Sequence, residues 1–109
     1  MGRKVHSRLK TLKQWKKIVE KAALTINKLY PEAELYVTGG AAEERLTINS
    51  DIDILVVFSR KMSWKEKVEA LVKIWEKLEE EIPEHYILEI HILEKNEASK
   101  IKCRKIKIT

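Results

Sequence analysis

Two aspartates, Asp51 and Asp53, stand on either side of Ile52 at the start of an apolar run over residues 52–58. The run is rich in β-branched residues and predicts a buried strand. Because successive side chains of a strand point to opposite faces, both carboxylates are expected on one face. Two such charges repel each other unless a cation lies between them, and Mg²⁺ binds carboxylate oxygens while keeping positions for water and substrate phosphates. The pair therefore predicts half of a divalent metal site.

A glycine pair precedes the aspartates by ten residues. The predicted strand over residues 34–38 ends at Gly39 and Gly40. Glycines without a Cβ atom allow a tight turn and a close approach to the backbone, and the N–H groups of such a turn can form a nest that binds phosphate. Phosphate and metal sites side by side indicate a nucleoside triphosphate substrate.

The complete pattern is Gly39-Gly40, ten residues of which Ser50 is the last, and then Asp51-Ile52-Asp53 leading into the apolar strand. It resembles the signature of the nucleotidyltransferase domain of the polymerase β superfamily in its minimal form, closely over residues 36–58. The resemblance implies Mg²⁺ (or Mn²⁺) as cofactor. It assigns catalysis and metal binding to Asp51 and Asp53, and nucleotide binding to Gly39, Gly40 and Ser50.

A third carboxylate stands in the predicted strand over residues 86–93, where Glu89 and His91 alternate with apolar residues. A charged residue in so apolar a strand needs a partner. The resemblance gives Glu89 the role of third catalytic and metal-binding carboxylate, whereas a salt bridge to a basic neighbour is the structural alternative. His91 either reaches the metal or a phosphate, or is a hydrogen-bonded surface imidazole.

The sequence departs from the family pattern within the glycine loop. Gly40 replaces a serine whose hydroxyl contacts the nucleotide phosphates, and Glu44 replaces a glycine. Arg45 has the guanidinium geometry to bind a nucleotide phosphate but could instead pair with a neighbouring glutamate. Ser50 could equally cap a turn. These departures favour the alternative of a degenerate, nucleotidyltransferase-like module that neutralises a partner protein by contact.

Two helices are predicted around these strands. Apolar residues recur at steps of three and four over residues 7–30, with Trp15 in the core-facing stripe, and again over residues 64–82, from Trp64 onward. Ser63 and Glu66 form a capping box that starts the second helix, and prolines follow both helices. One apolar face on each helix indicates an α/β fold (an α+β mixed sheet), with a small sheet, both helices on one face and the site on the open face. The tail over residues 96–109 is compatible with a short helix capped by Asn96 or with a strand over residues 106–108.

The length, net charge and cysteine content of the chain limit its possible organisation and partners. Its 109 residues are expected to form one domain, residues 1–109, with no separate substrate lobe, so it would work in a complex or as a homo-oligomer. A net charge of +5 suits nucleotides, RNA or acidic partners, or simply a solvated surface. The lone Cys103 excludes an internal disulfide, and no apolar run approaches the roughly 20 residues that span a membrane. These features predict a cytoplasmic protein without a membrane partner.

These interpretations combine into one functional expectation. The chain should transfer a nucleoside monophosphate from an NTP, ATP first among them, to a hydroxyl of a protein or RNA. The resemblance further implies a HEPN-type ribonuclease as partner, with this chain as its antitoxin. A general RNA-binding domain is a third reading, which rests on charge alone.

Overall fold

The computed structural model describes residues 10–38, 51–101 and 105–108. Residues 10–13 form a helical turn. The remaining elements are, in chain order, α2 (Trp15–Leu29), β1 (Glu34–Thr38), β2 (Ile52–Phe58), α3 (Trp64–Glu81), the 3₁₀ helix η1 (Pro83–Ile87), β3 (Leu88–Glu94), α4 (Lys95–Ser99) and β4 (Lys105–Lys107).

The predicted first helix is interrupted at Gln14. Gln14 has φ −103° and ψ 18°, its backbone N–H donates to the Thr11 carbonyl, and regular α-helix starts at Trp15. The predicted stripe is confirmed from there: Val19, Ala22 and Ile26 are buried, and Trp15 packs against the core. A tight turn therefore separates residues 10–13 from α2. The predicted residues 7–9 lie outside the described residues.

The helix α3 begins at the predicted capping box. The Glu66 N–H donates to Ser63 Oγ, and the Ser63 N–H donates to Glu66 Oε1. The prediction that Trp64 belongs to the buried stripe is wrong, because its side chain is 81% exposed. Trp64 is the first residue of α3, and the first buried position of this helix is Ala70, six residues later.

The four strands form one mixed sheet in the order β3-β2-β1-β4. The strand β1 pairs antiparallel with both β2 and β4, and β2 pairs parallel with β3. A parallel pair needs a long crossover, and α3 is that crossover. Helix α3 therefore connects the parallel strands β2 and β3, and β4 forms the opposite edge of the sheet.

The strand predicted over residues 86–93 begins two residues later than expected, at Leu88. Residues Pro83–Ile87 form η1, in which the His85 N–H donates to the Ile82 carbonyl and the His85 ring nitrogen Nδ1 lies 2.8 Å from the same oxygen. Proline at the start of this helix suits its fixed φ. Tyr86 and Ile87 are therefore helical rather than extended, and β3 starts at Leu88.

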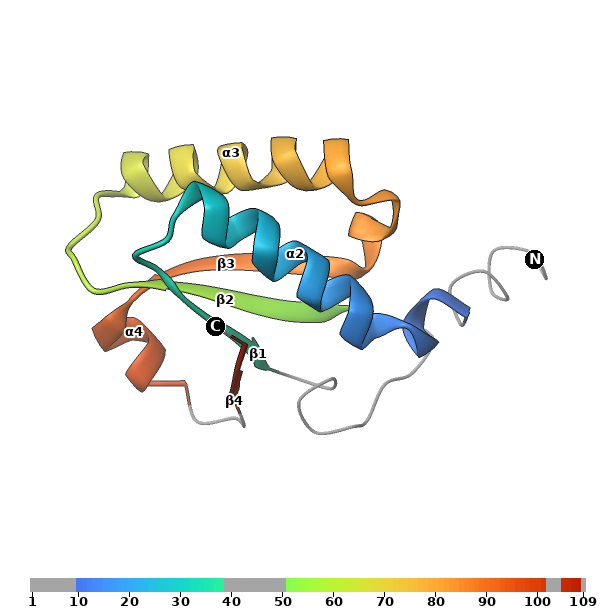
Figure 1. The fold of residues 1–109 in the computed structure, drawn as a ribbon. Coiled ribbons are helices and arrows are strands. Elements are labelled where there is room, and N and C mark those ends of the chain that lie inside the picture. Colours follow the sequence, from blue (N-terminus) through green and yellow to red (C-terminus); the bar gives the residue numbers. More distant parts are fainter. Residues whose placement is uncertain (1–9, 39–50, 102–104, 109) are drawn as a thin grey trace.

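The two faces of the sheet differ. Helices α2 and α3 lie together on one face, as predicted (Figure 1), and cover the main core, which includes Leu35, Ile54, Phe58 and Ile74. The other face is not wholly open, because α4 lies against it (Figure 1), with Ala98 packed against Leu55 and others. The tail thus contains both a helix and a strand, and Glu94 rather than Asn96 caps α4.

One polar group within the core links the two large helices. The buried hydroxyl of Thr25 in α2 donates a hydrogen bond to Glu81 Oε2 in α3 at 2.8 Å. A buried donor that finds such a partner avoids the cost of desolvation without compensation.

None of the helices in the described part of the chain is long and apolar enough to cross a membrane.

Candidate functional site

Two of the predicted carboxylates meet where β2 and β3 begin. The parallel register places Asp53 directly opposite Glu89, and the antiparallel register places Thr38 opposite Asp53 on the other side. Directly opposed side chains on one face lie within contact distance. The register therefore produces a polar row across three strands.

The side chains of this row point away from the main core because their neighbours fill it. Ile52 and Ile54 flank Asp53 and are completely buried, and Leu88 and Ile90 flank Glu89 on the same core face. Strand alternation then directs Asp53 and Glu89 to the opposite face. The side chains of Asp53 and Glu89 are 30% and 54% exposed, so solvent reaches both.

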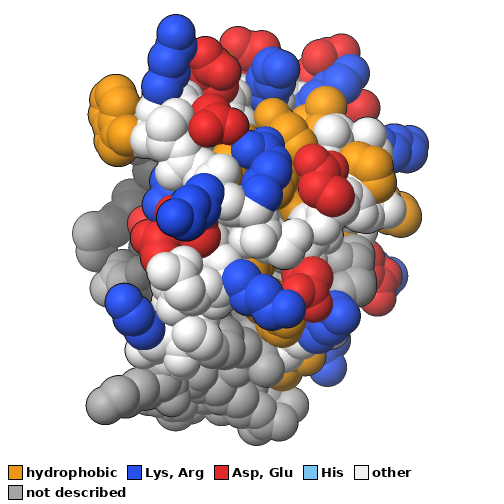
Figure 2. Space-filling model, turned by 90° about the vertical axis from the view of Figure 1, so that its left-hand side faces the viewer, with side chains coloured by type: hydrophobic (Ala, Val, Ile, Leu, Met, Phe, Trp, Pro, Cys, Tyr) orange, Lys and Arg blue, Asp and Glu red, His pale blue; other side chains and the backbone are white. Residues whose placement is uncertain are grey.

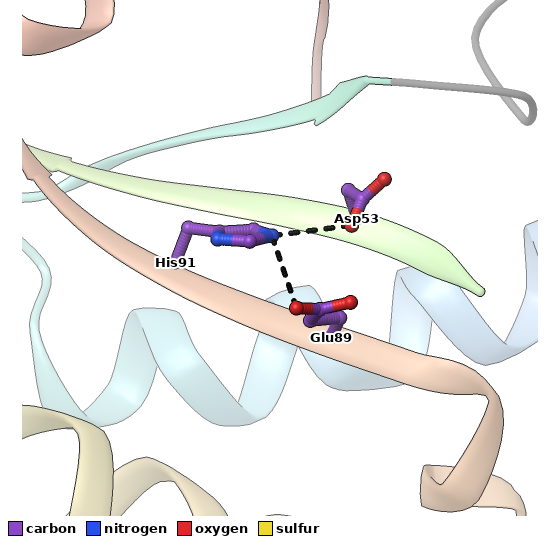
Figure 3. Close-up of side chains that lie close together, drawn as sticks. All are labelled: Asp53, Glu89 and His91. Carbon is purple, nitrogen blue, oxygen red and sulfur yellow. Dashed lines mark hydrogen bonds and ion pairs between the residues drawn. The ribbon is translucent and has the colours of Figure 1, made fainter.

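His91 completes the group. Its Nε2 atom lies 3.1 Å from Asp53 Oδ1, within hydrogen-bond distance, and 3.9 Å from Glu89 Oε1. Figure 3 shows the imidazole of β3 directed at both carboxylates. The sequence is compatible with a metal-binding or a surface role for His91, and the structure places its ring beside both carboxylates. Its spacing of two from Glu89 was the available signal.

Among the described residues, Asp53, Glu89 and His91 each offer one ligand atom within 4.8 Å of the others. Asp51 is not in this group; it lies exposed, immediately before β2, and makes interactions of its own. The predicted Gly39, Gly40, Arg45 and Ser50 lie outside the described residues. The structure thus brings together two of the three predicted carboxylates and adds a histidine.

The separations suit a divalent cation. In an octahedral shell of about 2.1 Å radius, neighbouring ligand atoms lie roughly 3.0 Å apart and opposite ones roughly 4.2 Å apart. His91 Nε2 lies 3.1 Å from the Asp53 oxygen, close to the distance between neighbouring ligands, and 3.9 Å from the Glu89 oxygen, between the two distances; all three atoms lie within 4.8 Å of one another. Carboxylate and imidazole groups are both common metal ligands. The residues present therefore fit the kind of ion that the sequence predicts.

The electrostatic setting of the group also suits a cation. Within the described part of the chain, neither Asp53 nor Glu89 forms an ion pair with lysine or arginine, and His91 is their close partner. Unneutralised carboxylates at this separation repel each other. Binding of a divalent ion would relieve that repulsion, and the exposed fractions leave space for water and phosphate ligands.

A surface hollow lies at the end of β2 that is far from Asp53. It has a volume of about 450 Å³ and is lined by Arg60, Lys61 and Lys95, together with Glu94 and small polar residues. The face on that side of the molecule carries lysine and arginine side chains interspersed with acidic ones (Figure 2). Arg60 is already paired with Glu66 at 2.8 Å. This mixed face does not resemble a continuous cationic surface for RNA.

Comparison with known proteins bears on the family and the fold. The family profile described as nucleotidyltransferase domain matches residues 11–109. A crystal structure of a Sulfolobus solfataricus protein provisionally assigned as a nucleotidyltransferase is 25% identical with a TM-score of 0.57, covering 94% of this chain and 83% of that one.

A second crystal structure with the same provisional assignment is 24% identical with a TM-score of 0.56, covering 90% of this chain and 97% of that one, and shows the shared fold. No functionally curated protein matches the sequence significantly.

Proposed function

Because the chain belongs to the nucleotidyltransferase domain family, we propose that it transfers a nucleoside monophosphate from a nucleoside triphosphate, with ATP as first candidate, to a hydroxyl group. The observation that carries the proposal is the register of β2 and β3, which sets Asp53 against Glu89 on a solvent-accessible face. Among the described residues no lysine or arginine pairs with these two carboxylates, so they are suited to hold a divalent ion. In this family the natural use of such an ion is phosphoryl-group chemistry.

The carboxylates have distinct roles in this proposal. Asp53 and Glu89 hold the divalent ion, Mg²⁺ or Mn²⁺, and Asp51 contributes from its position immediately before β2. When bound, the ion neutralises charge on the phosphates as the acceptor oxygen attacks and the pyrophosphate leaves. Glu89 Oε also takes the proton of the acceptor hydroxyl, as a general base within hydrogen-bond distance would.

The proposed transfer exchanges one phosphorus–oxygen bond for another. The acceptor oxygen forms a bond to the α-phosphorus, the bond from that phosphorus to the β-phosphate oxygen breaks, and pyrophosphate leaves with the electron pair. Gly39 and Gly40 hold the triphosphate through backbone N–H groups, with Ser50 and Arg45 as further phosphate contacts. The protein mainly positions the two reactants, which is the principal requirement of in-line transfer.

The acceptor belongs to a second molecule in this proposal. A HEPN-type ribonuclease is the protein partner implied by the resemblance, and the chain's net charge of +5 also permits RNA. We propose the hydroxyl of a protein partner as first candidate, because the described face around Arg60 carries both charge signs rather than a cationic surface (Figure 2).

Label transfer tests the activity. The protein is incubated with α-phosphate-labelled ATP, Mg²⁺ or Mn²⁺, and either a HEPN-type ribonuclease or RNA. We expect labelled partner and released pyrophosphate. Asp53→Asn and Glu89→Gln should each lower the rate by at least about 100-fold, since loss of even an outer-shell contact costs 10- to 100-fold. Glu80→Gln is the matched control: this glutamate is 70% exposed and lies on α3, across the sheet from the site.

Two results would contradict the proposal. Transfer that is unchanged in both site variants, with circular dichroism showing intact folding, would place the activity elsewhere. No transfer with any acceptor, combined with inhibition of the ribonuclease that persists in Asp53→Asn, would instead support the alternative, a binding module that acts by contact. That alternative draws its support from Gly40 at the family's serine position.

A further inference from the structure

The nitrogen of His91 occupies the position of a third ligand. Its Nε2 atom lies 3.1 Å from Asp53 Oδ1 and 3.9 Å from Glu89 Oε1. Figure 3 shows both interactions meeting at this one atom. A histidine that served only to orient Asp53 would need the first contact alone. The second contact makes the nitrogen part of the same group as both oxygens.

Backbone geometry holds this nitrogen in place. His91 pairs with Leu55 in the β2–β3 register, one row along the same face from the Asp53–Glu89 pair. Leu55 is buried beneath α4 together with Ala98. The imidazole therefore stands between an apolar patch and the carboxylates, 39% exposed, with its ring edge toward the carboxylates. Two adjacent strands fix all three ligand atoms, so little rearrangement is required to bind an ion.

We infer that His91 is a metal ligand and that the nitrogen it supplies makes this site prefer Mn²⁺ or Co²⁺ over Mg²⁺. The inference rests on the metal site of the proposed function and deepens it. Imidazole nitrogen suits first-row transition metals, whereas Mg²⁺ is a hard ion that prefers an all-oxygen shell. Two carboxylate oxygens with one imidazole nitrogen form a mixed set that Mn²⁺ and Co²⁺ accept more readily than Mg²⁺ does.

A histidine that binds the metal and a histidine that only positions Asp53 have different effects on metal affinity. A positioning histidine would affect the affinity for every divalent ion by a similar factor, because it would act only through the Asp53 carboxylate. A ligating histidine contributes mainly to the binding of ions that favour nitrogen. The ratio of the Mg²⁺ and Mn²⁺ dissociation constants therefore distinguishes the two roles, and its test does not require turnover.

Metal titrations provide this ratio. The tag-free protein is titrated calorimetrically with MnCl₂ and, separately, with MgCl₂ in the same mildly alkaline buffer. For His91→Ala we expect Mn²⁺ affinity to fall by about 10- to 100-fold and Mg²⁺ affinity to change much less. His91→Asp, which restores an oxygen ligand, should shift the preference toward Mg²⁺. The matched control is His85→Ala, because His85 lies in η1, bonded to the Ile82 carbonyl and away from the site.

Pulsed electron paramagnetic resonance of bound Mn²⁺ provides direct evidence. A directly ligated imidazole gives a ¹⁴N modulation, which we expect in the wild type and in His85→Ala but not in His91→Ala. Mn²⁺ binding that requires Asp53 yet shows no ¹⁴N coupling, with both ions weakened equally by His91→Ala, would overturn this inference and leave the proposed function intact. Mn²⁺ binding unaffected by Asp53→Asn and Glu89→Gln would instead overturn the metal site on which both proposals depend.

Discussion

At the scale of single residues, the site depends on the side chains that point away from it. Ile54 follows Asp53 in β2 and is fully buried between the sheet and the two long helices. Its burial fixes which face of β2 is inward, and a shift by one residue would turn Asp53 into the core. An apolar side chain that never touches a ligand thus determines where the carboxylate lies.

Replacing Ile54 by alanine should destabilise the whole fold. Removing a buried isoleucine side chain leaves a cavity, and we expect the free energy of unfolding to fall by about 2–5 kcal/mol. Urea titration followed by circular dichroism measures this change. Val72→Ala is the control, since Val72 is 49% exposed on α3 and should change stability by less than about 0.5 kcal/mol. Equal effects of the two substitutions would show that the core has been placed incorrectly.

At the scale of elements, an ionic contact joins helices on opposite faces of the sheet. Lys67 of α3 lies 2.6 Å from Glu97 of α4 and 3.8 Å from Glu94 at the end of β3, which is an edge strand. The hydrogen bond between Lys67 and Glu97 raises the pKa of the lysine and lowers the pKa of the glutamate. The contact therefore connects α4 to α3 past the end of β3.

The pKa directions predict how this contact depends on pH. Because the pKa of Glu97 is lowered in the folded state, its stabilisation is complete above the ordinary glutamate pKa and is lost as the pH falls through the lowered value. The raised pKa of Lys67 means that its share is complete below the ordinary lysine pKa and is lost as the pH rises through the raised value. The contact should thus act across the neutral range.

A double-mutant cycle with Lys67→Met and Glu97→Gln tests this expectation. Because both side chains are partly solvated, we expect a coupling free energy of about 0.2–1 kcal/mol near neutral pH, shrinking as the pH falls below the ordinary range of glutamate. The Lys77–Glu81 pair, at 3.9 Å on one helix, is the control and should couple less. A coupling that grows on acidification would contradict the assigned directions.

At the scale of the whole molecule, the candidate site exists only when the chain is folded. Asp53 and Glu89 are far apart in the sequence, and α3 crosses between their strands. An unfolded chain offers no preformed arrangement of these ligands, so metal binding should be coupled to global stability. The position of the tail also depends on the folded structure, because its strand β4 pairs with β1.

Metal-dependent stabilisation follows from this coupling. At a free Mn²⁺ concentration of about 100 times the dissociation constant, the free energy of unfolding should rise by about 2.7 kcal/mol. Denaturant titrations with and without Mn²⁺ measure the increase, and Asp53→Asn should lose most of it. The same increase in Asp53→Asn would place the ion elsewhere, for example at the Glu94 and Glu97 carboxylates.

The sequence alone determined β1, β2, most of the two long helices and the faces of the strands. Periodicity placed β1 and β2 correctly and identified the core-facing stripe of α2, because burial repeats with the period of the backbone. The alternation in β3 put Glu89 and His91 on the face away from the helices for the same reason. The capping box gave the start of α3, since it depends on residues three apart.

Tertiary structure decided the quantities that no local pattern carries. The register that sets Asp53 opposite Glu89 depends on how α3 packs as it crosses the sheet. The exposure of Trp64 depends on which positions of α3 pack against the core, and these are Ala70, Ile74 and Leu78. The placement of α4 against Leu55, and the approach of His91 Nε2 to both carboxylates, arise from contacts between strands and helices. Such contacts join residues distant in sequence, so only the folded chain determines them.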